Sequence, residues 1–444
     1  MFYFVYPIKD TYIYELNDNS EKNFGSDDKL VLKKDVDGLT GINGVSRILL
    51  QFDLSGLSQS IVEGDTAGTN FYLRLFEKKS SELSNTYSLS AFPLSQSWEG
   101  GSGYTTQNPN IRDGVSWVRK DESFNNTNWS SSFVNISNSD SNRYELLSGT
   151  VTASNGSNQI SGSGTSLTSL KSGDHIKIVN GSTSQIFNVS EVKSNVSMSI
   201  NGNWSGVNIN SASIFRNNSF GGGIWLKDYG CSQTFTNQSP DVEMDITTMV
   251  NNWLDGTIEN NGLILMWSGS QESSGDITGD INFFSFDSDS VYSPRIESRD
   301  TVAPYSTTLT ALTNDGTKDN QLYMINLKEV YSENENPKFR VGGRERYIVK
   351  STSTTPSINY TKHSGIQKGF YSIVDVETGQ TIIPFTANIS EHTNFLSADN
   401  TSNYFKLNLK SFIKNRNYKI LLKLKDVNNR ERIFDDNWIF RVES

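Results

Sequence analysis

The feature that most constrains the fold of this chain is a pattern of aromatic-rich β-strands that stops near residue 147 and resumes at residue 216. Before the gap, Phe71, Leu73 and Leu75 place apolar side chains at every second position, the period of a strand with one buried face. After the gap, residues 262–267 again form an apolar run. The pattern predicts one β-sandwich whose two halves, residues 1–147 and 216–302, are separated by an insertion.

The inserted segment, residues 148–215, is predicted to be a small β-barrel-like module. It has few aromatic residues, many serines and glycines, and five short stretches of strand character, which suits a small barrel. A flexible Ser- and Asn-rich linker is the alternative. The alternating pairs Ile176/Ile178 and Phe187/Val189 argue against such a linker, because a linker needs no buried face.

Residues 303–444 are expected to form a separate C-terminal domain. Ala303-Pro304 marks a linker, and the composition beyond it is richer in Lys and Arg. Seven strands are predicted, at residues 321–327, 338–341, 347–349, 369–374, 404–407, 418–424 and 438–442. This number of short strands is typical of an immunoglobulin-like sandwich, or of two smaller ones. The whole chain is therefore expected to be all-β, with a jelly-roll-like sandwich, a barrel-like insert and an immunoglobulin-like sandwich.

One helix is predicted, over residues 245–254. Asp245 can cap its N-terminus, and Gly256 can close its C-terminus. Four apolar side chains fall on one face of this helix, at Ile246, Met249, Val250 and Trp253. We expect Trp253 to plug one end of the sandwich.

Composition excludes several classes of function. The chain of 444 residues has a formal net charge of −10, whereas a large nucleic-acid-binding surface needs clustered Lys and Arg. No apolar run reaches the ~18 residues that span a bilayer, so we expect no membrane insertion. Residues 1–10 lack a basic region and a small-residue cleavage site, so they are predicted to form a strand rather than a signal peptide.

A single cysteine, Cys231, excludes an intrachain disulfide framework. A large, Ser- and Asn-rich, all-β chain without signal peptide or disulfides is common among proteins that assemble inside a cell and later work outside it. Components of virions are one such class.

Several short motifs follow one another in the two halves of the predicted sandwich. They are Asp10-Thr-Tyr-Ile, Asn23-Phe-Gly-Ser, Ser46-Arg-Ile-Leu-Leu-Gln-Phe-Asp-Leu, Trp98-Glu-Gly-Gly, Gly114-Val-Ser-Trp, Asp245-Ile-Thr through Trp253-Leu, Asn261-Gly-Leu-Ile-Leu, Phe283-Phe-Ser-Phe and Ser293-Pro-Arg-Ile. In this order they resemble the DNRLRE (disaggregatase-related) domain, a jelly-roll β-sandwich. Residues 148–215 depart from the ordinary domain.

The other two segments resemble parts of phage particles. Gly149-Thr-Val, Gly162-Ser-Gly-Thr and Leu170-Lys-Ser-Gly-Asp-His-Ile are similar to a small β module of phage tail and fibre proteins. The stretch from Phe370-Tyr-Ser-Ile-Val to Trp438-Ile-Phe-Arg-Val resembles end domains of tailed-phage structural proteins.

These resemblances imply a structural component of a tailed-phage virion, in the tail, neck or fibre-attachment region. Such a protein is assembled in the host cytoplasm, is located in the virion, and contacts other virion proteins and copies of itself. Because DNRLRE domains also occur in cellular polysaccharide-binding proteins, the second hypothesis is a carbohydrate-binding module that attaches the particle to host surface polysaccharide. A polysaccharide-degrading enzyme is third. Such phage enzymes usually have long β-helices, which require a regular repeat of about 20 to 25 residues, and this sequence shows no such repeat.

The sequence offers no catalytic constellation, and we expect no enzyme activity and no cofactor. The three histidines, His175, His363 and His392, have no metal-ligand spacing. No Gly-x-Ser-x-Gly elbow stands between a strand and a helix. Cys231 lacks an activating motif and is expected to be a small buried hydrophobe.

Four carboxylates are weak candidates for a structural calcium site. Asp276 and Asp280 lie in one loop, and Asp287 and Asp289 lie in the next. Calcium prefers carboxylate oxygens, but the spacing differs from that of an EF-hand. Solvated acids in turns are the favoured alternative.

Four aromatic residues are the candidates for contact with a glycan or a partner protein. Trp98, Tyr104, Trp117 and Trp129 fall in the loop-rich residues 96–130, and sugar rings stack on exposed aromatic faces. Burial at the ends of the sandwich or at an interface is the favoured alternative for these side chains.

Overall fold

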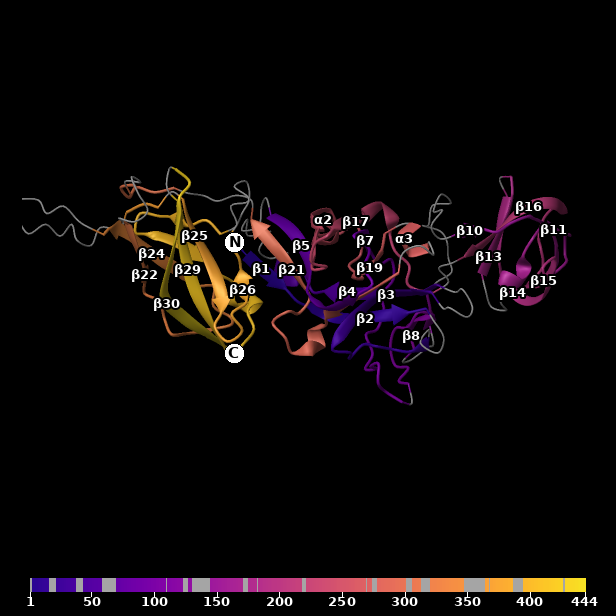
Figure 1. Ribbon diagram of the computed structural model, residues 1–444, viewed down its shortest axis with the longest axis horizontal. Helices are drawn as coiled ribbons and strands as arrows, with labels where there is room; N and C mark the ends of the chain where they lie inside the picture. The colour runs from indigo at the N-terminus through magenta and orange to yellow at the C-terminus, as the bar shows by residue number, and fades with distance from the viewer. Residues whose placement is uncertain are drawn as a thin grey trace, which may run out of the picture.

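The structure is a computed structural model of the chain. The residues it describes are 2–15, 21–36, 43–57, 69–108, 110–122, 127–129, 144–170, 175–181, 183–217, 221–268, 270–273, 278–300, 306–312, 320–346, 364–366, 368–385, 394–425 and 428–444. Their regular structure is almost entirely β-strand, which confirms the predicted all-β class. Figure 1 places a central sandwich between a second sandwich, formed by the C-terminal part of the chain, and a barrel.

The central sandwich consists of a four-stranded and an eight-stranded sheet. The smaller sheet has the order β1 (Phe2–Val5), β21 (Arg295–Asp300), β5 (Thr69–Leu75) and β18 (Val242–Asp245). The larger sheet has the order β17 (Cys231–Thr236), β7 (Thr86–Pro93), β19 (Leu263–Trp267), β4 (Asn43–Phe52), β3 (Lys29–Val36), β20 (Gly279–Phe284) and β6 (Glu77–Ser81), with β2 (Pro7–Tyr14) paired to β4. Their facing apolar side chains form one core.

Strand pairing in this sandwich joins the two halves of the chain. Strand β17 pairs with β7, β18 with β5, β19 with β4 and β7, β20 with β3 and β6, and β21 with β1 and β5. Each of these five strands follows the insertion, and every partner precedes it. Neither half therefore holds both sides of these hydrogen-bonded ladders.

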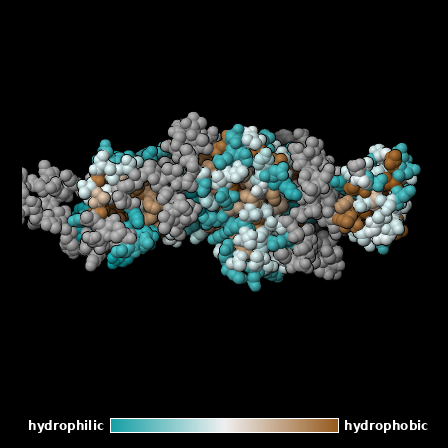
Figure 2. All heavy atoms as spheres, turned by 90° about the horizontal axis from the view of Figure 1, so that it is seen from above, coloured by the Kyte–Doolittle hydropathy of each residue, from teal (hydrophilic) through white to brown (hydrophobic). Residues whose placement is uncertain are grey.

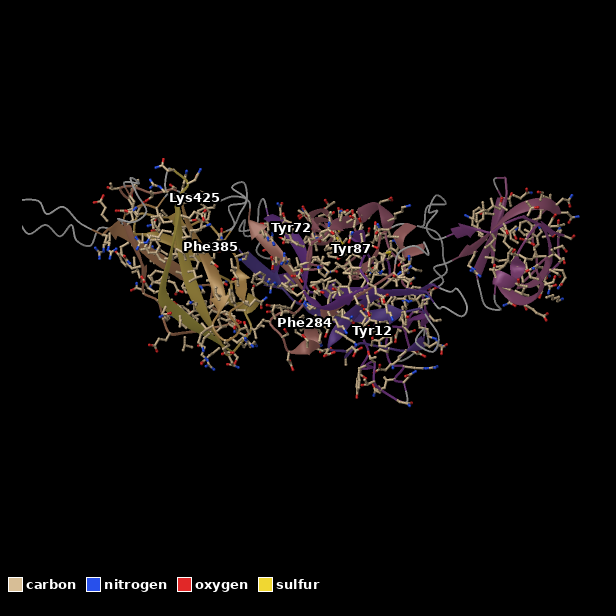
Figure 3. The ribbon with its side chains drawn as sticks, viewed as in Figure 1. Tyr12, Tyr72, Tyr87, Phe284, Phe385 and Lys425 are labelled. Atoms are coloured by element: carbon tan, nitrogen blue, oxygen red, sulfur yellow. The ribbon has the colours of Figure 1, made fainter. Side chains whose placement is uncertain are left out.

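Aromatic rings fill much of the core between the sheets. The ring centroids of Tyr12 and Phe24 lie 4.2 Å apart, and those of Tyr87 and Phe235 lie 4.8 Å apart in a stacked arrangement. Tyr12 and Tyr87 come from the half before the insertion and are labelled in the central sandwich of Figure 3. Stacked rings of this kind add to the stabilisation that apolar burial provides.

Residues before and after the insertion also pair outside the two sheets. The Ser95 amide donates to the Ile224 carbonyl at 2.9 Å, and the Leu226 amide donates to the Pro93 carbonyl at 2.9 Å. Leu94 and Trp225 form an isolated antiparallel bridge between these two hydrogen bonds. The ends of the insertion itself pair at Tyr144 and Asn217, and an insertion whose ends lie side by side costs the host fold little.

The inserted module is a closed barrel. Its sheet runs β11 (Thr150–Ala153), β12 (Gln159–Ser163), β15 (Ser197–Asn201), β14 (Thr183–Ser194), β13 (His175–Asn180) and β16 (Ile209–Asn217), and β16 pairs with both β13 and β11. Strand β10 (Tyr144–Leu146) pairs with the end of β16. The barrel-like prediction is confirmed, but the closing strand β16 was missed, because Ala212 weakens the apolar signal of its inward face.

The C-terminal part of the chain forms a second sandwich. One sheet has the order β22 (Asn320–Ile325), β24 (Lys338–Glu345), β28 (Asn403–Lys406) and β27 (Ser397–Ala398). The other has the order β23 (Val330–Ser332), β30 (Glu431–Glu443), β29 (Arg416–Lys425), β25 (Gly369–Asp375) and β26 (Thr381–Ile383). The strand predicted at 347–349 lies outside the described residues.

Strand β1 connects the two sandwiches. The Phe4 amide donates to Ser411 Oγ at 2.9 Å, and the Tyr6 hydroxyl donates to the Ser411 carbonyl at 3.1 Å. The rings of Phe4 and Phe412 have centroids 6.2 Å apart, and Phe4 is buried in the core of the C-terminal sandwich. The first strand of the chain thus contributes to both bodies.

The predicted helix is present as α2 (Thr247–Leu254) and starts two residues later than expected. Asp245 lies before the N-cap position, and its Oδ1 accepts a hydrogen bond from the Thr247 amide at 2.9 Å. Met249, Val250 and Trp253 are buried as expected, and Gly256 follows the helix with a φ of +75°. The remaining short elements are α3 (Ser270–Ser273) and the ribbon of β8 (Arg119–Asp121) and β9 (Thr127–Asn128).

The surface is mixed in character. The visible face of the central sandwich in Figure 2 is mostly hydrophilic or intermediate, whereas the barrel shows hydrophobic areas. Leu146, Val196 and Val207 are exposed apolar side chains of the barrel region. Among the described helices, none combines the length and the apolar composition needed to cross a membrane.

Arg47 on β4 links segments of the sandwich that precede the insertion with segments that follow it. Its guanidinium donates to both carboxylate oxygens of Glu272 at 2.8 and 2.9 Å, and to the Gly222 carbonyl at 2.7 Å. The guanidinium carbon lies 4.7 Å from the ring centroid of Trp117 and 5.0 Å from that of Trp225. One buried cation therefore holds together the loop at Trp117, residues 222–225 and helix α3.

Replacing Arg47 by Met should lower the free energy of unfolding by about 3–5 kcal/mol, because Glu272 is left as a largely buried charge without its partner. Urea denaturation followed by Trp fluorescence measures this change. Arg112→Met is the matched control, since Arg112 pairs with Glu21 at the surface and should cost at most about 1 kcal/mol. Equal losses for the two variants would contradict the role given to Arg47.

Replacing residues 144–217 by a short Gly-Ser linker should leave the central sandwich folded. The two ends of this segment are paired at Tyr144 and Asn217, and the barrel has a core of its own. The shortened chain should keep a cooperative thermal transition in circular dichroism. Loss of that transition would show that the sandwich depends on the barrel.

Candidate functional site

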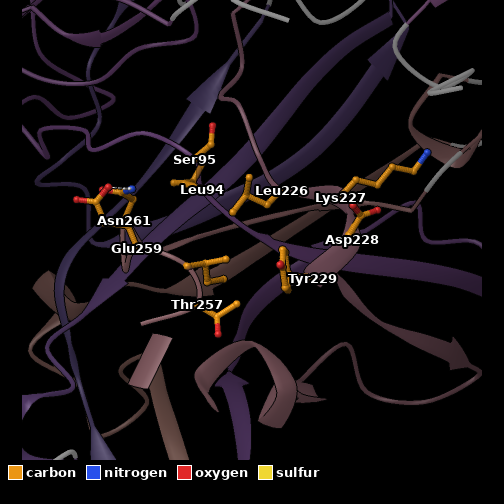
Figure 4. Close-up of a pocket in the computed structure, with 10 residues that line it drawn as sticks. Leu94, Ser95, Leu226, Lys227, Asp228, Tyr229, Thr257, Glu259 and Asn261 are labelled. Carbon is orange, nitrogen blue, oxygen red and sulfur yellow. Dashed lines mark hydrogen bonds between the residues drawn. The ribbon is translucent and has the colours of Figure 1, made fainter. Parts of the chain in front are cut away.

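A cavity of about 420 Å³ lies in the central sandwich, beside the bridge between Leu94 and Trp225 (Figure 4). Three segments of the chain meet there, and the pairing of residues 93–95 with residues 224–226 brings two of them together. The lining residues are Leu94, Ser95, Leu226, Lys227, Asp228, Tyr229, Thr257, Ile258, Glu259 and Asn261.

Each wall of the cavity follows a regular element. Leu94 and Ser95 come directly after β7, and residues 226–229 form a turn that includes the 3-10 helix η4 (Lys227–Tyr229). Residues 257–261 connect α2 to β19. This last connection is fixed by Asn260, whose side-chain amide donates to the Phe52 carbonyl at 2.9 Å.

The cavity combines an apolar floor with a polar rim. Leu94 and Ile258 are buried, and Leu226 and Tyr229 are half-buried against the sandwich core. The exposed rim consists of Lys227, Asp228, Thr257 and Glu259. Figure 4 shows the Tyr229 ring beside Leu226 in the middle of the lining residues. This arrangement suits a small molecule that has one apolar face and several hydroxyl groups.

Two side chains on the left of Figure 4 supply further hydrogen-bonding groups. Asn261 is buried, and its Nδ2 donates to Glu259 Oε2 at 3.3 Å. The Asn261 carbonyl accepts a hydrogen bond from Trp98 Nε1 at 3.0 Å. The hydrogen bond from Trp98 therefore fixes Asn261 in place. Glu259 is exposed at the rim.

The structure buries three of the four predicted aromatic contact residues. Trp98 is 1% exposed, Trp117 packs on Arg47, and Trp129 donates from Nε1 to the Ser116 carbonyl at 3.1 Å. These covered indole faces leave no room for a sugar ring, so these three tryptophans are corrected from contact candidates to core residues. Tyr104 is 42% exposed, but it does not line the cavity.

The loops that carry these tryptophans are held by Asn23. Its Nδ2 donates to the carbonyls of Gly100 and Val115 at 2.7 and 2.8 Å, and its Oδ1 accepts from the amides of Gly25 and Gly103 at 3.1 and 2.8 Å. A Cβ atom at Gly25 would lie 2.2 Å from the Gly100 carbonyl oxygen, so only glycine fits. The Asn-Phe-Gly-Ser and Trp-Glu-Gly-Gly motifs therefore have structural roles.

The calcium candidates do not form one recognisable site. Asp276 lies outside the described residues, and Asp280 accepts from Asn282 Nδ2 at 2.8 Å. Asp287 and Asp289 lie in and just after the 3-10 helix η5 (Phe286–Ser288). In the described part of the chain, no three His, Cys, Asp or Glu side chains converge to hold a metal ion. A structural calcium site thus stays a prediction.

Neither Cys231 nor His175 lines the cavity. Cys231 lies on β17 beside the Ala91 carbonyl and Met244 Sδ, and burial raises the pKa of its thiol to about 12. His363 and His392 lie outside the described residues, whereas His175 begins strand β13 of the barrel.

A family model for carbohydrate-binding module family 96 matches residues 2–114. The matched segment covers the strands from β1 to β7 and the loops around Trp98. It therefore includes Leu94 and Ser95 of the cavity but not the walls at 226–229 and 257–261. No curated protein matches the chain.

Tyr229 and its neighbours were missed at the sequence level. They lie in Trp225-Leu-Lys-Asp-Tyr-Gly230, a short polar stretch without periodicity. The apolar run at 223–226 resumes the strand pattern just before it and was the one available signal of a junction. Only the pairing of Pro93 and Ser95 with residues 224–226 shows that Tyr229 stands beside Leu94 and Ile258.

Asp10 on β2 should make the stability of the sandwich depend on pH. Burial raises the pKa of its carboxyl from 3.8 to about 7, although the Phe286 amide donates to it at 2.8 Å. The folded state therefore binds more protons than the unfolded state between about pH 4 and 7, and stability should fall as pH rises through this window.

Asp10→Asn should reduce this loss of stability, measured as urea midpoints at pH 5, 6, 7 and 8. Asp53→Asn removes an exposed carboxylate of the same sandwich and should leave the pH dependence unchanged. An Asp10→Asn protein with the pH dependence of the original chain would exclude Asp10 as its source.

Proposed function

We propose that this protein binds carbohydrate, and that a sugar unit of a polysaccharide occupies the cavity lined by Leu94, Tyr229 and Ile258. The observation that carries the proposal is the half-buried Tyr229 ring above an apolar floor, surrounded by exposed polar side chains. It stands in a β-sandwich whose first half matches a carbohydrate-binding module family. Binding requires no catalysis, and the family is one of binding modules.

The dimensions and chemistry of the cavity agree with this role. Its volume of about 420 Å³ lies in the range of about 300–1,000 Å³ that small-molecule sites occupy. The carbon-bound hydrogens of a pyranose can pack on Tyr229, Leu226 and Ile258. Its hydroxyl groups can exchange hydrogen bonds with the polar rim, where each bond replaces one to water.

The two carboxylates at the rim do not make a hydrolase site. Asp228 and Glu259 are both exposed. Glycoside hydrolysis uses a carboxylic acid that an apolar environment keeps protonated, opposite a second carboxylate. Neither rim carboxylate has that environment, so we assign both of them to binding.

The sequence analysis placed a structural role in a tailed-phage virion first and carbohydrate binding second. The family match supports the second hypothesis and does not point to a virion protein. Location in a virion, contacts with other virion proteins and self-association stay predictions. A carbohydrate-binding module carried on a phage fibre would satisfy both hypotheses, because attachment to host polysaccharide is then its task in the particle.

Tyr229→Ala should weaken glycan binding by about tenfold or more, because loss of a ring that packs on the ligand removes about 1.4 kcal/mol or more. Glycan-array screening of the full chain identifies a ligand, and isothermal titration calorimetry then measures the affinity. Tyr104→Ala is the matched control, since Tyr104 is exposed but outside the cavity. Equal affinities of Tyr229→Ala and the original chain would place the binding site elsewhere.

A further inference from the structure

We propose that the free end of the inserted barrel is a site of spontaneous chemical modification, at which three asparagines convert to aspartate or isoaspartate. These residues are Asn155, Asn180 and Asn201, and each is followed by glycine. None of the three lines the carbohydrate cavity, so this modification is independent of the proposed function.

The three Asn-Gly pairs lie in connections at one end of the barrel. Asn155-Gly156 joins β11 to β12, Asn180-Gly181 joins β13 to β14, and Asn201-Gly202 begins the connection from β15 to β16. Because neighbouring strands of the barrel are antiparallel, these connections share one end. The chain enters and leaves at the opposite end, where Tyr144 pairs with Asn217, and Figure 1 shows β10 on the side toward the central sandwich.

The reacting side chains are accessible. All three asparagines are exposed, and within the part of the chain that the structure describes no hydrogen bond engages their carboxamides. A Cβ atom at any of the following glycines, Gly156, Gly181 or Gly202, would meet no atom within 4 Å beyond its chain neighbours. The turns can therefore rearrange without displacing a packed neighbour.

The pair Asn261-Gly262 has the same two residues in the opposite environment. Asn261 is 5% exposed, and its Nδ2 donates to Glu259 Oε2 at 3.3 Å. The Gly262 amide donates to Asn260 Oδ1 at 3.2 Å, and a Cβ atom at Gly262 would lie 2.3 Å from the Leu50 carbonyl oxygen. Reaction at this pair requires local opening of the packed segment, so the chain contains its own control.

The reaction needs only water besides the chain itself. The glycine amide nitrogen loses its proton to hydroxide and attacks Cγ of the preceding asparagine. The new N–Cγ bond closes a succinimide ring, and the Cγ–Nδ2 bond breaks to release ammonia. Water then opens the ring at either of its carbonyl carbons, which gives aspartate or isoaspartate. No oxidant or reductant takes part.

The glycine amides set an order among the three sites. The Gly156 amide donates to the Trp204 carbonyl at 2.8 Å, and this hydrogen bond must break before its nitrogen can attack. Asn155 should therefore react more slowly than Asn180 and Asn201.

Each conversion adds a negative charge at neutral pH, because a carboxyl of this kind ionises at about pH 4. The connections at the free end contain no Asp, Glu, Lys, Arg or His, over residues 154–158, 180–183 and 201–208. An uncharged end of the barrel thus becomes acidic as the molecule ages.

The test follows these four Asn-Gly pairs in the full chain. The folded protein is kept at mildly alkaline pH, and peptide mapping by mass spectrometry measures aspartate and isoaspartate at each site over time. Asn180 and Asn201 should convert at least about tenfold faster than Asn261, because only Asn261 must wait for local opening. In urea that unfolds the chain, the four rates should become similar.

Two variants assign the new charges. Asn180→Gln and Asn201→Gln keep the carboxamide but move it one methylene away, so the succinimide ring cannot close. After ageing, each variant should lack one acidic form in isoelectric focusing. Asn203→Gln is the matched control, since Asn203 is an exposed asparagine of the same end that precedes Trp204, and it should leave the pattern unchanged.

Either of two results would overturn the proposal. One is that Asn180 and Asn201 convert no faster than Asn261 in the folded chain. The other is that folding slows Asn180 and Asn201, relative to urea, by as large a factor as it slows Asn261.

Discussion

The pairing of late strands with early strands is the constraint on which the rest of the structure depends. All five strands β17 to β21 find their hydrogen-bonded partners among strands that precede the insertion. The chain must therefore return to the sandwich after the barrel, and residues 224–226 then pair with residues 93–95. The cavity depends on this pairing, since its walls come from the end of β7, the turn at 226–229 and the connection after α2. The barrel is compatible with the sandwich because its own ends pair side by side, at Tyr144 and Asn217.

Two polar side chains hold the loops of the central sandwich. Arg47 joins the loop at Trp117, residues 222–225 and α3 through Glu272, Gly222 and two indole rings, and Asn23 uses both donors and its acceptor oxygen to hold the glycine-rich loops. Buried groups of this kind are stable only when their hydrogen bonds are complete. The motifs that contain Asn23 and Arg47, which are among the most recognisable of the chain, therefore have structural roles. The residues at the rim come from segments with no distinctive pattern.

Much of the fold could be predicted from the sequence, because it depends on local periodicity. Alternation in Phe71, Leu73 and Leu75 marks β5, and the apolar face of Met249, Val250 and Trp253 marks α2. Strand β16, which closes the barrel, was not predicted because Ala212 gives little apolar signal. The site was less accessible for a different reason. Trp98, Trp117 and Trp129 stood in loop-like sequence, but local sequence does not show which loops fold back over a sheet end. Tyr229 becomes notable only when strand pairing brings it to Leu94 and Ile258.

The central claim is that a sugar unit packs on Tyr229 in the cavity of the central sandwich. The most direct measurement is a crystal structure of the full chain with an oligosaccharide that it binds in solution. The account predicts density for a pyranose ring against Tyr229 and Leu226, with hydroxyl groups within hydrogen-bond distance of Glu259 or Asp228. An oligosaccharide bound on another surface, with the cavity between Leu94, Tyr229 and Ile258 filled only by water, would contradict it.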